Sequence, residues 1–237
     1  MENGKLLILA MDSSAKAASV AVCKDNALLG QYFQNNGLTH SKTLLSMTKD
    51  LLKNLDVSIE DIDLIAVSSG PGSFTGVRIG VAAAKGLAWG ADKPVCGVSP
   101  LEAMAYQLQE PNTTTTICAV MDARRNQVYN ALFELKGGTL LRQCQDRAIS
   151  LEDLAAELQN IGSPVCLVGD GAEISYEYLS AADIPCKLAP QLLRDQTAFG
   201  AALAAIHAIQ TTATALEPSY LRPPQAEREK SQYDKNL

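Results

Sequence analysis

The stretch SSGPGSFTGVRIG at residues 68–80 is the most informative part of this 237-residue chain. It reads as a glycine-rich turn between an apolar strand and a small-residue helix, a place where many proteins bind phosphate. It matches neither common phosphate fingerprint, because no lysine follows Gly76 and Thr75 stands where a dinucleotide site needs its third glycine. Ser73 also lies one position too early for a G-x-S-x-G nucleophile elbow. The turn therefore predicts a strand–turn–helix unit with some other purpose.

Around this turn, the first half of the chain alternates strands and helices. Short apolar or β-branched runs predict strands, and apolar residues spaced by three and four predict helices. The expected strands are 6–11, 17–23, 28–33, 63–69 and 94–98, and the expected helices are 41–55, 76–90 and 100–109. The predicted order is therefore β-β-β-α-β-α-β-α.

The second half repeats this order. Its expected strands are 116–121, 127–135, 139–146, 164–168 and 186–189, and its expected helices are 150–159, 171–181 and 196–210. Asp12 and Asp122 lie 110 positions apart at the ends of matching strands, as do His40 and Ser150 at matching helix starts. A tandem duplication explains this spacing. We expect an α/β protein of two similar units, residues 1–110 and 111–237, the second ending in an extended tail.

Two tandem units of this order resemble the actin, hexokinase and 70-kDa heat-shock superfamily, whose units each contain a ribonuclease H-like sheet. The resemblance implies an ATP site between the units, formed by two phosphate-binding turns and an adenosine loop. The corresponding stretches read DSSA at 12–15, DARR at 122–125 and GDG at 169–171. The first turn lacks the glycine that would let its backbone come close to a phosphate. In the adenosine loop, an acidic residue separates the two glycines. We expect weak or absent nucleotide binding and no cofactor; the degenerate candidates are Asp12, Ser13, Ser14, Arg124, Gly169 and Gly171.

Composition excludes several functional classes. The two histidines, His40 and His207, are too far apart in sequence for a His-x-x-x-His metal site. The six cysteines form no C-x-x-C pair, so we expect reduced thiols and no metal site. The net charge of −6 opposes tight binding of a polyanion by the chain alone. No apolar run is long enough to cross a bilayer and no signal peptide is evident, so we expect a cytoplasmic protein.

The helix that follows the glycine-rich turn has a small residue at every fourth position, namely Gly76, Gly80, Ala84 and Ala88. Such a stripe lets another element approach closely, either the helix's own sheet or a partner helix. Glycine inside a helix costs about 0.5–1 kcal/mol relative to alanine, so Gly80 needs a compensating packing role. The preceding helix also carries more leucines than one sheet face needs. We therefore favour a helix-mediated protein interface.

Three further stretches complete the pattern: LAMDSS at 9–14, THS at 39–41 and PSYLR at 218–222. Together with residues 67–80 they closely resemble the TsaB family, also called YeaZ, and the resemblance spans the whole chain. It implies a bacterial accessory protein for the tRNA modification N6-threonylcarbamoyladenosine at position 37. Members of this family pair with a catalytic paralogue, TsaD, which carries the metal-binding histidines, and an ATPase, TsaE, joins the pair.

The resemblance also implies where partners bind. The helices of the first unit would contact TsaD, and related surfaces would support a homodimer. The tRNA would meet this chain only indirectly, through the complex. The interface residues expected on these helices are His40, Leu44, Leu45, Thr48, Gly76, Arg78, Gly80, Ala83, Ala84 and Leu87.

Two other functions stay open. The chain could be an ATPase or small-molecule kinase that uses Asp12 and the turn with Arg124 and Arg125, whose guanidinium groups suit phosphate. A glycoprotease, the older label of this superfamily branch, is disfavoured because the sequence has no paired histidines.

Overall fold

The computed structural model describes residues 6–109, 114–161 and 164–222, which form two sheets with helices on both faces of each. The first sheet has the strand order β3-β2-β1-β4-β5, in which β1, β4 and β5 pair in parallel and β2 pairs antiparallel with both β1 and β3. Its strands are β1 (Leu7–Asp12), β2 (Ala18–Lys24), β3 (Ala27–Gln34), β4 (Leu64–Ser68) and β5 (Val95–Val98). The predicted order of elements in this half is confirmed.

The second sheet has the order β11-β10-β6-β7-β8, and β9 also pairs with β7. Its strands are β6 (Thr114–Asp122), β7 (Gln127–Lys136), β8 (Thr139–Arg142), β9 (Arg147–Ser150), β10 (Val165–Val168) and β11 (Cys186–Leu188). The strand expected at 139–146 is therefore wrong in detail, because β8 and β9 pair with opposite ends of β7 and leave a break between them. The expected unit boundary, 110/111, lies outside the described residues.

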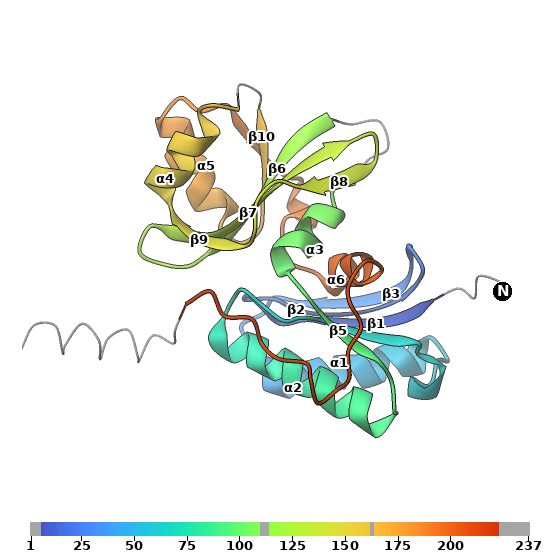
Figure 1. Cartoon of the computed structure of the whole chain (residues 1–237). Coiled ribbons are helices and arrows are strands. Elements are labelled where there is room, and N and C mark those ends of the chain that lie inside the picture. The colour runs from blue at the N-terminus through green and yellow to red at the C-terminus, as the bar shows by residue number, and fades with distance from the viewer. Residues whose placement is uncertain (1–5, 110–113, 162–163, 223–237) are drawn as a thin grey trace, which may run out of the picture.

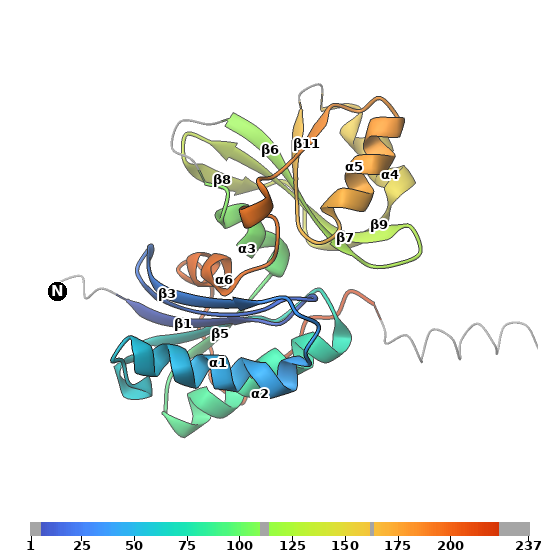
Figure 2. The same ribbon diagram turned by 180° about the vertical axis from the view of Figure 1, so that it is seen from behind.

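Helices cover the outer face of each sheet. The first sheet carries α1 (His40–Asn54) and α2 (Phe74–Gly90), and the second carries α4 (Leu151–Leu158) and α5 (Ala172–Ala181) (Figures 1 and 2). Short helical turns, η1 (Ile59–Asp61) and η2 (Gln191–Leu193), lie in the connections. Ser150, expected at a helix start, is the N-cap of α4, since its side chain accepts a hydrogen bond from the backbone N–H of Asp153.

The two remaining helices, α3 (Pro100–Tyr106) and α6 (Ala198–Ala205), pack against each other between the sheets (Figure 1). Each covers the sheet of the other half of the chain: α3 contacts β6 and β7, whereas α6 contacts the strands of the first sheet. The core on the inner side of the first sheet therefore mixes Ile8 and Ala10 from β1 with Ala201 and Ala205 from α6. This exchange of helices joins the halves through buried apolar surface.

The segment after α6 returns to the first sheet. Thr211 forms an antiparallel bridge to Val95 at the sheet edge, and the chain then runs along α2 toward the glycine-rich turn. Within the described residues, no helix has the length and apolar character needed to span a membrane.

Candidate functional site

The glycine-rich turn packs directly on the turn that follows β1. The N–H of Ser73 donates to the carbonyl oxygen of Ser14 at 2.7 Å, and the hydroxyl of Ser13 donates to the carbonyl oxygen of Gly76 at 2.9 Å. A Cβ added to Gly72 would lie 2.4 Å from Ser14 O, and one added to Gly76 would lie 2.1 Å from Ser13 O. The glycines are therefore required because two backbone segments touch.

The N-terminus of α2 is partly satisfied by the turn itself. The Ser73 side chain is the N-cap and accepts a hydrogen bond from the N–H of Gly76 at 3.3 Å. Since a phosphate at a helix N-terminus needs the free amides of the first turn, this cap reduces the resemblance to a phosphate-binding loop.

Asp12 lies under the first turn and is only 1% exposed. One carboxylate oxygen accepts hydrogen bonds from the N–H and the hydroxyl of Ser14, both at 2.8 Å, and the other accepts from the hydroxyl of Ser68. Burial raises the pKa of Asp12 above its usual value, and these hydrogen bonds partly oppose the rise. Because Asp12 is absent from the residues lining the cleft described below, it acts in this structure as an internal anchor for the turn.

The turn between β6 and β7 repeats this geometry in the second half of the chain. Asp122 accepts a hydrogen bond from the N–H of Arg124 at 2.7 Å, matching the bond from Ser14 to Asp12. Arg124, Arg125 and Asn126 all have positive φ angles, so the turn is left-handed over three consecutive non-glycine residues. The two turns therefore share the aspartate hydrogen bond, as expected from a duplication, but they differ in backbone, because no residue at 13–17 has a positive φ angle.

The predicted adenosine loop is filled by the chain's own backbone. A Cβ added to Gly169 would lie 1.9 Å from Val120 O, and one added to Gly171 would lie 2.9 Å from the N atom of Asp122. Asp170, between them, accepts a hydrogen bond from Gln196 at 3.0 Å, and burial raises its pKa. Both glycines serve close packing against the end of β6.

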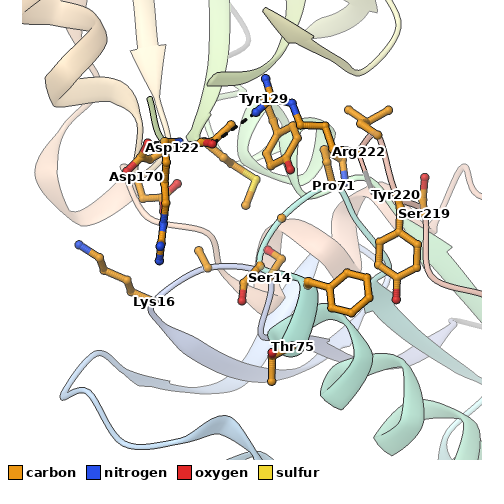
Figure 3. A pocket seen from close by; sticks show the side chains of 18 residues that line it. Ser14, Lys16, Pro71, Thr75, Asp122, Tyr129, Asp170, Ser219, Tyr220 and Arg222 are labelled. Carbon is orange, nitrogen blue, oxygen red and sulfur yellow. Dashed lines mark hydrogen bonds between the residues drawn. The ribbon is translucent and has the colours of Figure 1, made fainter. Parts of the chain in front are cut away.

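A cleft of about 610 Å³ lies between the turn that follows β1 and the turn between β6 and β7. Figure 3 shows Asp122 and Asp170 on the side of the second sheet and Ser14 and Thr75 on the side of the first. Its charged lining residues are Lys16, Arg124, Arg222, Asp122 and Asp170. The two acids offset two of the three cations, so the cleft offers little net attraction for a polyphosphate. Among the described residues there is no group of three or more His, Cys, Asp or Glu side chains that could hold a metal ion.

The fold thus brings the nucleotide-loop candidates to the same region, but they differ in exposure and in the residues they contact. Arg124 lines the cleft and is exposed, and Ser14 borders the cleft although it is buried like Asp12 and Ser13. Gly169 and Gly171 contact β6. Arg125, the second arginine of the turn, is exposed but does not line the cleft.

Asp12 gives a test of this internal role. Asp12→Asn keeps acceptor and donor groups for Ser14 and Ser68 while removing the buried charge, so we expect unfolding free energy at pH 7 to be maintained or increased. Burial raises the pKa of Asp12 in the folded state above its usual, unfolded-state pKa. Ionisation of Asp12 therefore lowers the stability of the fold as pH rises from the usual pKa to the raised one. The Asp12→Asn variant should not show this fall in unfolding free energy with rising pH. Asp12→Ala should instead cost about 2 kcal/mol by leaving buried donors unpaired.

Urea denaturation of the wild type and both variants at several pH values between 3.5 and 7 measures these differences. Equal destabilisation by Asp12→Asn and Asp12→Ala at pH 7 would contradict the assignment, because it would show that the negative charge itself is needed.

The small-residue stripe of α2 faces inward. Gly76, Gly80, Ala84 and Ala88 are all buried, and a Cβ on Gly80 would lie 2.6 Å from the Ser13 hydroxyl and 3.3 Å from the Val67 side chain. The prediction that this stripe docks a partner helix is therefore wrong. The helix uses it to approach its own sheet and the first turn.

The ten predicted interface residues divide by exposure. Five are buried inside the chain and cannot contact a partner without rearrangement: Leu44, Thr48, Gly76, Gly80 and Ala84. Leu45 and Arg78 are exposed, and His40, Ala83 and Leu87 are half-buried. The ring nitrogen Nε2 of His40 donates to the carbonyl oxygen of Ala15 at 2.9 Å, so His40 also attaches α1 to the first turn.

The outward side of α2 carries a second small-residue series that the sequence analysis missed. Ala82, Gly86 and Gly90 are exposed at four-residue spacing, and Cβ atoms added to either glycine would meet open space. Trp89 beside them is 79% exposed, and Leu45 on the neighbouring α1 is 51% exposed. The spacing was visible in the sequence, but it coexists with the buried series on the same helix, and only packing distinguishes them.

The fold and its cleft define a two-unit α/β protein of the actin-like ATPase fold. A family model described as "TsaD: tRNA N6-adenosine threonylcarbamoyltransferase" matches residues 35–230. The TsaB proteins of Bacillus subtilis and Escherichia coli, each named a tRNA threonylcarbamoyladenosine biosynthesis protein, are both 35% identical to the chain. Each alignment covers 69% of this chain and 71% of the relative.

A solved structure from Pseudomonas aeruginosa, described as an uncharacterized protein with similarity to peptidase YeaZ, superposes with a TM-score of 0.77. It is 28% identical and covers 92% of this chain and 100% of its own. The chain belongs to the TsaB family.

Proposed function

We propose that the chain is a non-catalytic accessory subunit in the synthesis of N6-threonylcarbamoyladenosine at adenosine 37 of tRNA. It binds and activates the catalytic paralogue TsaD together with the ATPase TsaE, and this role places it in the cytoplasm. The observation that carries the proposal is the pairing of a sealed glycine-rich turn with an exposed apolar helix face: the residues that would bind phosphate contact their own chain, whereas α1 and α2 leave apolar side chains uncovered.

The proposed docking surface, which we call the α1–α2 outer face, consists of Leu45, Ala82, Ala83, Gly86, Leu87 and Trp89. The small residues allow a partner helix to approach the α2 backbone, and the tryptophan and leucines supply apolar area to bury. Contiguous exposed apolar patches mark interaction sites more often than single exposed apolar side chains do. A homodimer through the same face would then compete with TsaD.

The charge of the chain supports an indirect relation to tRNA. A net charge of −6 gives unfavourable long-range electrostatics for a polyanion. The substrate tRNA would therefore be held mainly by the partner, with this subunit stabilising the partner's active form.

Reconstitution tests the function. The chain, TsaD and TsaE are mixed with tRNA and threonylcarbamoyl-adenylate, and the modified nucleoside is quantified after digestion. We expect modification to fall to background when the chain is omitted, and the chain alone to produce none. Modification of tRNA, or ATP turnover, by the purified chain alone would favour the alternative, an ATP-hydrolysing enzyme that uses Asp12 and the turn with Arg124 and Arg125.

The placement of the docking surface gives a separate prediction. Leu45→Glu puts a charge into the proposed interface, and Gly86→Leu adds bulk where the free chain has open space. We expect each to weaken the affinity for TsaD at least tenfold while leaving thermal stability within a few degrees of wild type. Isothermal titration calorimetry with purified TsaD measures the affinity.

Leu141→Glu is the matched control, since Leu141 lies on β8 of the second sheet and is 46% exposed, close to the value for Leu45. It should bind TsaD like the wild type. Unchanged affinity in both Leu45→Glu and Gly86→Leu would refute this placement while leaving the reconstitution result, and hence the function, standing.

A further inference from the structure

The segment 211–222, here called the C-terminal strap, is attached to the first half of the chain over most of its length. It begins at the bridge to Val95. The Lys85 ammonium on α2 donates to the carbonyl oxygen of Leu216 at 2.8 Å, and the Leu216 side chain is 4% exposed in the core beneath α2. The PSYLR stretch at its end was singled out in the sequence but has no part in the proposed docking or in the turn geometry described above.

The strap closes over the glycine-rich turn. The N–H of Ser219 donates to the carbonyl oxygen of Ser69 at 2.7 Å, and a Cβ on Gly70 would lie 2.1 Å from Ser219 O. The Tyr220 ring stacks on Phe74 with centroids 4.8 Å apart. Arg78 completes the cluster: its guanidinium carbon lies 3.8 Å from the centroid of the Phe74 ring, and its Nε donates to the Tyr220 hydroxyl at 2.8 Å.

Two residues later the strap reaches the other half of the chain. The Arg222 guanidinium donates to the carbonyl oxygen of Ala123 at 3.4 Å and to the side-chain oxygen of Gln127. Its carbon lies 5.5 Å from the centroid of the Tyr129 ring. All three partners belong to the left-handed turn between β6 and β7 or to the strand that follows it. Figure 3 shows Ser219, Tyr220 and Arg222 side by side at the edge of the cleft.

We propose that the C-terminal strap is a brace that fixes the opening of the cleft, with Arg222 as the tie between the halves. The helices α3 and α6 join the halves between the sheets (Figure 1), and Ala15 of the first turn packs against the core of the second sheet. The strap adds a further connection at the cleft edge. A connection at the cleft edge opposes rotation of the sheets about the connections that lie between them. The inference does not depend on the proposed function.

Because Tyr220 and Arg222 belong to one short segment, loosening either end transmits to the other. Tyr220 makes its stacking and hydrogen-bonding contacts with Phe74 and Arg78 on the first-sheet side, and Arg222 contacts the second. If the strap is a brace, loosening it on one side of the cleft changes the flexibility of the turn on the other side. Two independent local contacts would not have this effect.

Hydrogen–deuterium exchange of the full chain, read by mass spectrometry, tests this. In Arg222→Ala we expect amide exchange to accelerate at least threefold both in the turn at 122–128 and in the glycine-rich turn at 68–76, which Arg222 does not contact. In Tyr220→Ala we expect the same acceleration at 122–128. Arg194→Ala is the control, because Arg194 also contacts a backbone carbonyl and a side chain, Ala189 and Glu173, but only within the second half.

The control should leave exchange at 68–76 unchanged. Acceleration confined to 122–128 in Arg222→Ala and to 68–76 in Tyr220→Ala would overturn the brace, since each end would then be a separate contact. Exchange equal to wild type in both variants would overturn it as well. A variant too unstable to purify is replaced by Arg222→Lys, which keeps the charge but loses the two-pronged contact and should give a smaller acceleration in both segments.

Discussion

Gly76→Ala is expected to lower the free energy of unfolding by about 3 kcal/mol, although alanine is the better helix former. The added Cβ would lie 2.1 Å from the carbonyl oxygen of Ser13, which is backbone and cannot rotate away. Either α2 must move off the sheet or the first turn must move off α2. Both movements separate Ser73 from Ser14 and break the hydrogen bond that seals the glycine-rich turn.

The same helix supplies the control for this prediction. Gly86 lies on the outer side of α2 with open space at its Cβ position, so Gly86→Ala should increase stability by about 0.5–1 kcal/mol. The pair is compared by urea denaturation with a common m-value. Similar shifts of both midpoints in the same direction would mean that Gly76 is not in the close contact described.

Gly200→Ala is expected to cost about 2–3 kcal/mol for a related reason in a different place. Gly200 lies where α6 crosses α3, and a Cβ there would be 2.4 Å from the carbonyl oxygen of Ala103 and 2.8 Å from the Gln107 side chain. The hydroxyl of Thr197 caps α6 and also donates to the Gln107 side chain, so a shift of the helix would disturb that contact too. The substitution therefore weakens the packing that holds the two halves together.

Gly90→Ala, at the exposed end of α2, is the reference for Gly200→Ala because nothing lies near its Cβ position. Thermal unfolding should show a fall of several degrees for Gly200→Ala and little change for Gly90→Ala. If the two variants melt together, α3 and α6 do not make the close crossing on which the joining of the two sheets depends.

These predictions connect stability to the proposed function. In this chain the glycine-rich turn supports α2 from within, and the outer side of α2 carries the proposed docking surface. Substitutions such as Gly80→Leu would therefore act on folding before they act on a partner, since Gly80 contacts Ser13 and Val67. Tests of partner binding need residues with open space around them, such as Gly86.

Local sequence patterns were sufficient for several parts of the fold. Apolar runs and helical spacing predict the order of elements in the first half. Buried side chains recur every second residue in a half-buried strand and every three to four residues in a helix, so the sequence carries these periods. The spacing of Asp12 and Asp122 predicts two matching turns, and both have the same aspartate hydrogen bond to the N–H two residues later, although only the second turn is left-handed. The break at residues 143–146 was not predictable, since both flanking runs have strand-like composition and the break depends on pairing with β7.

The sequence by itself determined the class of fold, the duplicated halves, the family and the absence of paired histidines, because each follows from residue types at fixed spacing. Tertiary structure alone decided which side of α2 is buried and that α3 and α6 exchange sheets. It also decided that Asp12 is internal and that PSYLR joins the two halves. The physical reason is that a spacing defines a helix face or a turn, whereas the atoms that come to lie against it belong to distant parts of the chain.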